Sequence, residues 1–248
     1  MKQVLHLFSY PLSLVFYLLF GIVIVLLHPI QWVALNGFGY QAHKNTVDVL
    51  NWFILRCLNI LGTRFQFENR ASIPNAVPVI IASNHQSMWD IPPLYWFLRR
   101  CHPKFISKIE LAKGIPSISY NLRHGGSVLI DRNDPEQALQ QIEKMARYIS
   151  LHNRSVVIFP EGTRSRTGTP KPFKRKGLRA LLANAPKAYV LPVRIENSWQ
   201  LQRYGFFPMP LGTTVKITAF PAVAVAGRTP DELINVLEST VNGPEPVR

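Results

Sequence analysis

Residues 4–27 contain no aspartate, glutamate, lysine or arginine, which restricts where this part of the chain can lie. As one α-helix the run would be about 36 Å long, and the hydrocarbon core of a bilayer is about 30 Å thick. Lys2 precedes the run, and we expect His28 and Pro29 to end it. A buried core helix and a cleaved signal peptide are alternatives, but a core helix seldom runs so long without a charge, and no Ala-x-Ala-like cleavage site follows. We therefore predict an N-terminal hydrophobic membrane helix, which either crosses the bilayer or dips into it.

A second helix is expected over residues 47–61, after a predicted loop at residues 29–45. The Trp52-Phe53 pair suits the headgroup region of a bilayer, because aromatic side chains are enriched there. Packing of this helix on a following domain is an equal alternative. We accordingly divide the chain into membrane-associated helices over residues 1–62 and an α/β domain over residues 63–248.

Short apolar runs alternate with amphipathic ones in the predicted α/β domain. Strands are expected at residues 64–67, 79–82, 105–107, 128–130, 156–159, 189–195 and 215–220. Helices are expected at residues 89–100, in two pieces within 110–123, at 135–150, at 177–184 and from Thr229 onward. This alternation is typical of an α/β fold with a largely parallel or mixed sheet flanked by helices. Functional sites in such sheets lie beyond the carboxyl ends of the strands.

One of these strand ends carries a histidine and an aspartate. The apolar strand at residues 79–82 runs into a polar segment, where His85 is followed five residues later by Asp90. Five residues of regular helix turn through about 500°, so the two side chains would not share a helix face. If His85 instead stays in the loop and Ser87 caps a new helix, Asp90 falls in the first turn and can reach the imidazole. The pair could then act as a general base with an orienting carboxylate, although a loop histidine beside a capping aspartate is the simpler interpretation of the pair alone.

Four motifs along the chain together resemble one protein family. They are Asn84-His85-Gln86-Ser87-x-x-Asp90, Gly126-x-x-x-Ile130-Asp131-Arg132, Phe159-Pro160-Glu161-Gly162-Thr163-Arg164-Ser165 and Val190-Leu191-Pro192-Val193. In this order they resemble the blocks of the glycerolipid acyltransferases, and in particular those of bacterial 1-acyl-sn-glycerol-3-phosphate acyltransferases. The first and third motifs are specific, whereas the other two are weak alone. The resemblance implies an enzyme that moves a fatty acyl group to the sn-2 hydroxyl of 1-acyl-sn-glycerol-3-phosphate, giving phosphatidic acid in phospholipid biosynthesis.

The first motif would supply the catalytic residues. His85 would remove the proton from the acceptor hydroxyl as its oxygen attacks an acyl thioester, and Asp90 would orient and charge-balance the imidazole. The oxyanion of the tetrahedral intermediate also needs hydrogen-bond donors. Backbone amides around Gly162 are candidates for these donors, because glycine permits close approach.

Substrate-binding residues are expected in the other motifs. Arg164 is the candidate for the acceptor phosphate, because a guanidinium matches a phosphate with two hydrogen bonds. The resemblance implies acceptor-site roles for Glu161 and Gly162, and a phosphate contact for Lys108. Arg132 could serve likewise, although a solvated surface charge is an equal interpretation of this residue.

The net charge of the chain limits the kinds of partner that it is expected to bind. The formal net charge is +14, which favours an acidic partner. Residues 164–179 hold seven basic residues and no acidic one. This basic loop could hold anionic headgroups, the phosphates of acyl-CoA or an acidic acyl carrier protein. Nucleic acid is not expected, because the aromatic residues cluster in the N-terminal third instead of alternating with lysine and arginine.

Cysteine and histidine spacing indicates neither a disulfide framework nor a metal site. Cys57 and Cys101 are the only cysteines, and the histidines show no metal-ligand spacing. We expect no metal or bound cofactor, and we expect acyl-CoA or acyl carrier protein as donor, lysophosphatidic acid as acceptor and an anionic membrane as partners. The expected location is a bacterial inner membrane with the catalytic domain on its cytoplasmic side. The alternatives are the same chemistry on glycerol 3-phosphate or another lysolipid, and a non-catalytic basic protein that binds membrane or nucleic acid.

Overall fold

The N-terminal part of the chain folds into a helical hairpin. The structure, a computed structural model, describes residues 2–74 and 76–243, with side chains from residue 6 onward. Helix α1 (Lys2–Ile60) turns back on itself at Gly39, whose φ of 80° and ψ of −168° are not helical. A positive φ of this kind costs glycine little, because glycine has no Cβ. The turn at Gly39 therefore divides α1 into two arms.

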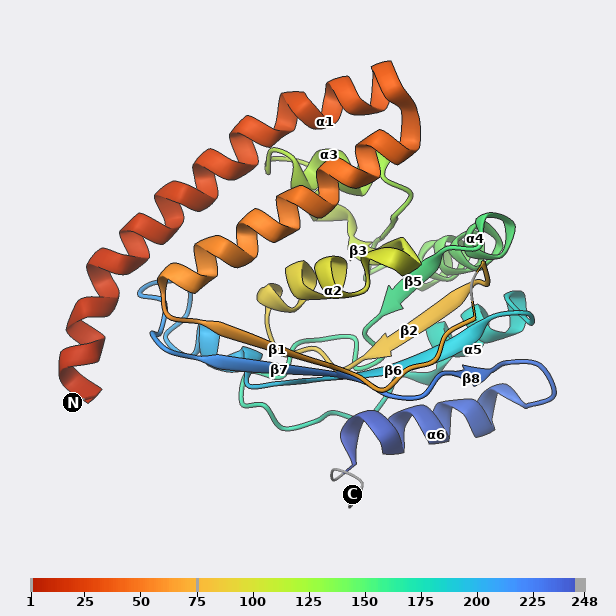
Figure 1. The fold of residues 1–248 in the computed structure, drawn as a ribbon. Coiled ribbons are helices and arrows are strands. Elements are labelled where there is room, and N and C mark those ends of the chain that lie inside the picture. The colour runs from red at the N-terminus through yellow and green to blue at the C-terminus, as the bar shows by residue number, and fades with distance from the viewer. Residues whose placement is uncertain (1, 75, 244–248) are drawn as a thin grey trace.

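The first arm, residues 2–38, and the second arm, residues 40–60, run antiparallel over the rest of the molecule (Figure 1). The predicted loop at residues 29–45 is therefore wrong, and so is a helix end at Pro29. Proline removes one hydrogen bond of the helix. The helix continues nonetheless, because the turn after Pro29 is packed on the protein, as the complete burial of Gln31 shows. The helix expected over residues 47–61 is confirmed as most of the second arm.

The first arm has one packed face and one exposed apolar face. The segment His6–Ile60 is long and apolar enough to be a candidate membrane span. Exposed apolar side chains follow the outward face of the first arm: Leu7, Phe8, Leu14, Val15, Leu18, Ile22, Val25, Leu26, Ile30 and Val33. Buried side chains follow the opposite face: Ser9, Ser13, Phe16, Ile24, Gln31 and Ala34. The predicted apolar N-terminal helix is therefore present, with protein along one side of it.

A mixed sheet forms the centre of the remaining chain (Figure 1). Its strands are β1 (Arg64–Asn69), β2 (Val79–Ser83), β3 (Pro103–Lys108), β4 (Val128–Ile130), β5 (Ser155–Ile158), β6 (Tyr189–Glu196), β7 (Thr214–Ala219) and β8 (Val223–Ala224). Their order is β1-β7-β6-β2-β5-β3-β4, and β8 pairs with β6. Strand β6 is antiparallel to β7 and β8, and the other pairs are parallel. The expected α/β class is confirmed, with β8 as a strand that the sequence analysis does not predict.

Helices flank the sheet (Figure 1). They are α2 (Ile91–Phe97), α3 (Ile118–His124), α4 (Pro135–His152), α5 (Arg175–Asn184) and α6 (Pro230–Asn242), with 3₁₀ turns η1 (Met88–Asp90), η2 (Arg99–Cys101), η3 (Ile109–Ala112) and η4 (Ser198–Gln202). The single helix expected at residues 89–100 is divided among η1, α2 and η2. Proline lies in the first turn of α2, where its missing N–H costs no helical hydrogen bond. The sequence analysis does not predict η4.

Both faces of β2 are buried, which explains its continuous apolar sequence. Ile81 belongs to a core shared with α1 and α2, whereas Ile80 belongs to the core beneath α4, α5 and α6. Neighbouring side chains of a strand point to opposite faces, so a strand between two helical layers needs apolar residues throughout. Phe16 of the first arm lies in the same core as Ile81, so the hairpin packs directly on the α/β part. The domain boundary at residue 62 stays a prediction.

Strands β2, β3, β4 and β5 run in the same direction, so their carboxyl ends lie along one edge of the sheet. The residues that follow these ends are brought to that edge: His85 after β2, Lys108 at the end of β3, Arg132 after β4 and residues 159–165 after β5. This strand-end edge is where α/β proteins place their sites.

Candidate active site

His85 and Asp90 face each other at the carboxyl end of β2. Nδ1 of His85 lies 2.8 Å from Oδ2 of Asp90. Ser87 begins η1 as its cap, because its hydroxyl accepts the backbone N–H of Trp89 at 3.1 Å. Asp90 occupies the first turn after this cap and so returns to the imidazole. Asp90 is completely buried, whereas 14% of the His85 side chain stays exposed.

The surroundings of Asp90 indicate which nitrogen of His85 carries the proton. Oδ2 of Asp90 accepts the backbone N–H groups of Gln86 at 2.7 Å and Ser87 at 3.0 Å. Ser198 donates its hydroxyl to Oδ1 of Asp90. A carboxylate that accepts several hydrogen bonds is ionised and has no proton to donate, so it also accepts from the imidazole. Nδ1 of His85 is therefore the donor in this pair. Nε2 then keeps its lone pair and points away from Asp90, which is the arrangement that a general base requires.

The segment after β5 packs on His85. The ring of Phe159 stacks on the imidazole with centroids 4.0 Å apart and an interplanar angle of 15°. The backbone N–H of Ser165 donates to the carbonyl oxygen of His85 at 2.7 Å. The two specific motifs of the sequence therefore contact each other, and His85 is held through both its ring and its backbone.

Glu161 is buried beside the His85 loop. Only 2% of Glu161 is exposed, and its carboxyl group is hydrogen-bonded to the backbone of Lys171 and His85. Burial raises the pKa of this carboxyl group to about 7, while the hydrogen bonds and the charge of Lys171 act in the opposite direction. Among the described groups, none hydrogen-bonds to Oε2 of Glu161. In this position Glu161 supports the His85 loop, and its predicted contact with the acceptor stays a prediction.

Gly162 forms a tight turn beside Lys174. Its φ is 70°, and its N–H donates to the carbonyl oxygen of Phe159 at 3.0 Å. A Cβ at this position would lie 3.0 to 3.2 Å from side-chain atoms of Lys174, which is tighter than ordinary contact. The positive φ therefore favours glycine at this turn, whereas the flexible end of the Lys174 side chain can shift to admit a Cβ. Because the amide of Gly162 is already bonded, the candidate oxyanion donors are other amides of this segment.

The three basic residues of the predicted phosphate site lie along the strand-end edge. Lys108 is the last residue of β3, in register with Ile130 of β4, and Arg132 follows two residues later. Burial lowers the pKa of Arg132, Arg164 lowers it further and Glu110 raises it, so these groups are close enough to interact. Lys108, Arg132 and Arg164 are all exposed. Neighbouring cations of this kind can bind an anion such as a phosphate.

Two residues of η4 join the site without having been predicted. Ser198 bonds to Asp90, and Oε1 of Gln202 accepts the backbone N–H of Met88 at 3.1 Å. The same oxygen of Gln202 accepts Nη1 of Arg164 at 3.3 Å. Strand β6 lies directly beside β2, which brings η4 to the His85 loop. Polar residues immediately after the Pro-containing strand were the one available signal for them in the sequence.

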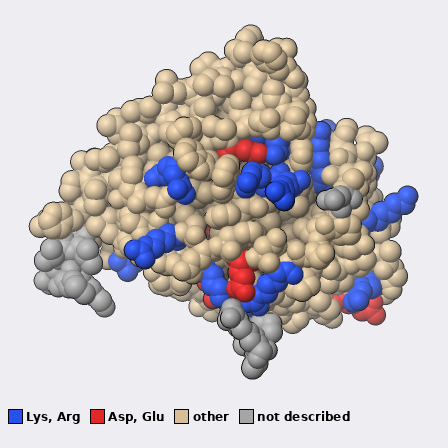
Figure 2. All heavy atoms as spheres, viewed as in Figure 1, with Lys and Arg blue, Asp and Glu red and all other residues tan. Residues whose placement is uncertain are grey.

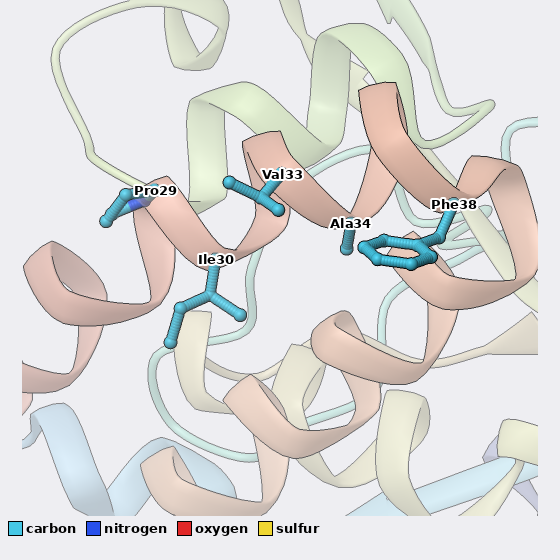
Figure 3. Close-up of a pocket in the computed structure, with 5 residues that line it drawn as sticks. All are labelled: Pro29, Ile30, Val33, Ala34 and Phe38. Carbon is cyan, nitrogen blue, oxygen red and sulfur yellow. The ribbon is translucent and has the colours of Figure 1, made fainter.

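An apolar hollow of about 340 Å³ opens on the first arm of α1 (Figure 3), and no residue of the strand-end edge lines it. Pro29, Ile30, Val33, Ala34 and Phe38 line it. None of these side chains can move a proton or bind a phosphate, so the hollow belongs to the apolar face of the hairpin. Across the described residues, no three or more His, Cys, Asp or Glu side chains gather as metal ligands would.

The fold and the site together define a class of protein. It is an α/β protein with a histidine–aspartate pair and a basic edge at the ends of parallel strands, beneath an N-terminal helical hairpin. Residues 64–196, more than half of the chain, match the acyltransferase family. The chain belongs to that family.

Individual relatives and one solved structure extend this comparison. The chain is 28% identical over 199 residues to 1-acyl-sn-glycerol-3-phosphate acyltransferase alpha of Mus musculus, covering 78% of this chain and 66% of that protein. It is 30% identical over 171 residues to the 1-acyl-sn-glycerol-3-phosphate acyltransferase of Pseudomonas aeruginosa, covering 69% and 63%. The match thus spans slightly less than two thirds of these relatives. The crystal structure of the 1-acyl-sn-glycerophosphate acyltransferase PlsC from Thermotoga maritima has the same fold, with a TM-score of 0.78 and 24% identity over 98% of this chain and 95% of that one.

Proposed function

We propose that the protein transfers a fatty acyl group from a thioester to the sn-2 hydroxyl of 1-acyl-sn-glycerol-3-phosphate and so forms phosphatidic acid. The observation that carries this proposal is the 2.8 Å contact between Nδ1 of His85 and Oδ2 of the buried Asp90, beside a basic edge. Binding of an acidic surface by charge alone requires neither an oriented imidazole nor a buried carboxylate. The names of the relatives from Mus musculus and Pseudomonas aeruginosa support this acceptor.

In the proposed reaction His85 is the general base. Nε2 of His85 takes the proton of the acceptor hydroxyl as that oxygen bonds to the thioester carbon, giving a tetrahedral oxyanion. The intermediate collapses with cleavage of the C–S bond, and the imidazolium returns the proton to the leaving thiolate. The products are an ester and a free thiol. Asp90 balances the charge of the imidazolium, and a positioned base contributes roughly 10²- to 10⁴-fold in rate.

The proposed acceptor phosphate lies against the basic edge. Arg164 is its principal ligand, because it is exposed and its guanidinium is directed by Gln202 toward the segment that carries His85. Arg132 and Lys108 add positive charge from the ends of the neighbouring strands. Held in this way, the phosphate places the sn-2 hydroxyl of the same molecule against His85.

The basic loop at residues 164–179 is the proposed binding surface for acyl-CoA or acyl carrier protein. Residues 175–179 of this stretch form the first turns of α5 and are not a loop, and there Arg175 and Arg179 bind Asp231 of α6 at 3.3 and 2.7 Å. The residues before α5 keep their charge for a ligand, and Arg166 and Lys174 are exposed there. Both donors carry the acyl group on an anionic carrier, which this charge would attract.

We also propose that α1 attaches the protein to a bacterial inner membrane, with the catalytic domain on the cytoplasmic side, where acyl thioesters are made. Figure 2 shows the first arm as an uncharged surface, with lysine and arginine grouped below it. Phe16, on the packed side of this arm, is completely buried. If the first arm crossed the bilayer fully, its packed side would have to leave the protein core. An arm that lies along the bilayer surface buries only its exposed face in lipid.

An acceptor panel tests the proposed reaction. The purified full chain in detergent micelles is given radiolabelled acyl thioester with 1-acyl-sn-glycerol-3-phosphate, glycerol 3-phosphate or other lysolipids, and the products are identified by mass spectrometry. Phosphatidic acid should form with the first acceptor, and His85→Ala and Asp90→Asn should each lower its rate by at least ~10²-fold while circular dichroism stays unchanged. Near wild-type turnover by a folded His85→Ala variant would overturn the mechanism.

A further inference from the structure

Aromatic side chains stand on the surface directly after η4. The aromatic loop, residues 203–208, carries Tyr204, Phe206 and Phe207, whose exposed fractions are 44%, 64% and 43%. Three large rings this exposed within four residues form a cluster, whereas single exposed apolar side chains are common on any protein. The loop therefore presents a surface suited to an apolar or partly apolar partner.

The aromatic loop is fastened to the first arm of α1. Tyr10 packs edge-on against Phe207, with ring centroids 5.6 Å apart. The hydroxyl of Tyr17 donates to the carbonyl oxygen of Phe206. Tyr10 and Tyr17 are seven residues apart, so they lie on one flank of the helix. The loop consequently extends the surface of the arm sideways.

The exposed face of the arm continues this surface. The ring of His6 lies 4.7 Å from that of Tyr204. Leu7, Phe8 and Leu14, in the same turns of the helix, are exposed on its outward face. A bilayer that receives the outward face of the arm would therefore lie next to the aromatic loop.

Basic side chains lie within the aromatic loop and beside it. The guanidinium carbon of Arg203 lies 4.7 Å from the ring centre of Tyr204. Arg164 is joined to the start of the loop through Gln202 at 3.3 Å. Tyrosine and arginine suit the headgroup region of a membrane, because the ring and the aliphatic stem meet apolar chains while the hydroxyl and the cation meet water and phosphate. This combination favours an anionic lipid surface over an apolar groove of another protein.

We propose that the aromatic loop is a second membrane contact, which inserts into the headgroup region of an anionic bilayer beside the first arm of α1. The inference rests on the proposed attachment of α1 to a membrane and goes beyond it. Through Gln202, the loop connects the lipid surface to Arg164 and to the backbone of Met88 in the His85 loop. The contact would hold the basic edge at the level of lipid phosphates, so that an acceptor need not leave the membrane to react.

Photo-crosslinking of the full chain on vesicles tests this contact. The photoreactive analogue p-benzoylphenylalanine replaces Phe206 in one variant and Leu14 of the first arm in another. Leu151 is the matched control, because it is 77% exposed and apolar but lies at the end of α4. Each variant is irradiated on vesicles of phosphatidylglycerol and phosphatidylcholine, and lipid adducts are detected by mass spectrometry. Lipid adducts are expected at positions 206 and 14, with none at position 151.

The other outcomes contradict the inference in distinguishable ways. Adducts at position 14 without adducts at position 206 would remove the loop contact and leave the attachment of α1 in place. A covalent dimer formed from position 206 in place of lipid adducts would assign the loop to a second copy of the chain. Absence of adducts at both positions would overturn the membrane attachment itself, while acyl transfer in micelles would still report on the proposed reaction.

Kinetics give an independent measurement. Phe206→Ser should raise the apparent KM for a long-chain lysolipid presented on vesicles by about tenfold, which corresponds to about 1.4 kcal/mol of lost attachment. The same variant should keep its kcat/KM for a short-chain lysolipid that is monomeric in water. Leu151→Ser should change neither value. An equal loss on both acceptors would show that Phe206 acts on the folded site and not on a membrane contact.

Discussion

Ser198 donates a hydrogen bond to Asp90, although 108 residues of sequence separate them. Ser198 also lies 2.5 Å, hydroxyl to hydroxyl, from Ser87, the cap of the turn that carries Asp90. The carboxylate that orients His85 is therefore held by its own loop and by a turn at the end of a different strand.

Ser198→Ala should lower kcat by about tenfold with little change in either KM, because Asp90 loses a charge-assisted hydrogen bond worth roughly 1.5 to 3 kcal/mol. Ser198→Thr should recover most of the rate, since the hydroxyl returns. Steady-state kinetics in micelles measure both variants. An Ala variant with normal kcat would reduce Ser198 to a packing residue.

Arg164→Ala should raise the apparent KM for the lysolipid by about ten- to a hundredfold, because the phosphate loses a charge-assisted contact. The KM for the thioester should move little, and Arg164→Lys should restore part of the loss, since charge returns without the two-pronged geometry. Arg166→Ala, an exposed change at the proposed donor surface, is the control for the lysolipid and should leave its KM unchanged. An effect of Arg164→Ala on the thioester alone would place the donor, and not the acceptor, against Arg164.

Glu161 should make the folded protein less stable as the pH rises. Burial raises the pKa of its carboxyl group to about 7. At pH values between 4.5, the ordinary pKa of a glutamate carboxyl group, and about 7, the folded protein keeps a proton that the unfolded chain has released. The contribution of this proton to the free energy of unfolding is therefore complete at low pH and is lost as the pH rises through about 7. Thermal unfolding in micelles from pH 5 to 8 should show this slope in the wild type and a smaller slope in Glu161→Gln. The exposed Glu136, replaced by Gln, should leave the slope unchanged.

Lys104 should have the opposite effect on the pH dependence of stability. It is 4% exposed at the start of β3, and burial, with the nearby Arg154 and Lys44, lowers the pKa of its amine to about 7. In the unfolded chain the amine of Lys104 keeps its proton up to about pH 10. Between pH 7 and about pH 10, folding therefore releases a proton, and the free energy of unfolding rises as the pH increases from 7. Lys104→Met should flatten the rise of the unfolding midpoint between pH 7 and 9.5. Lys113→Met, at an exposed position, should leave the rise of the unfolding midpoint unchanged. If the rise persisted in Lys104→Met, Lys104 would not be its cause.

Much of the fold was accessible from the sequence because the relevant contacts are local. The cap at Ser87 and the start of the last helix at Thr229 were predicted, and both depend on groups within three residues of each other, since a capping box begins the helix at Thr229. The apolar runs of buried strands and the amphipathic pattern of α4 are likewise local consequences of which faces are covered. The one large error, the loop at residues 29–45, had a signal that went unused, since residues 3–43 contain no Asp, Glu, Lys or Arg.

The sequence offered the pairing of His85 with Asp90 as one of two interpretations, because a cap at Ser87 would turn the chain within one helical turn, and that cap is present. The part of the site formed by η4 was decided only by the tertiary structure. Asn84 exchanges two hydrogen bonds with the backbone of Ile195, at 2.8 and 2.7 Å, which ties the His85 loop to the end of β6. That contact, and with it Ser198 and Gln202, depends on β6 lying beside β2. Strand order is set by how two helical layers cover both faces of the whole sheet, a property of the packed molecule that no short stretch of sequence contains.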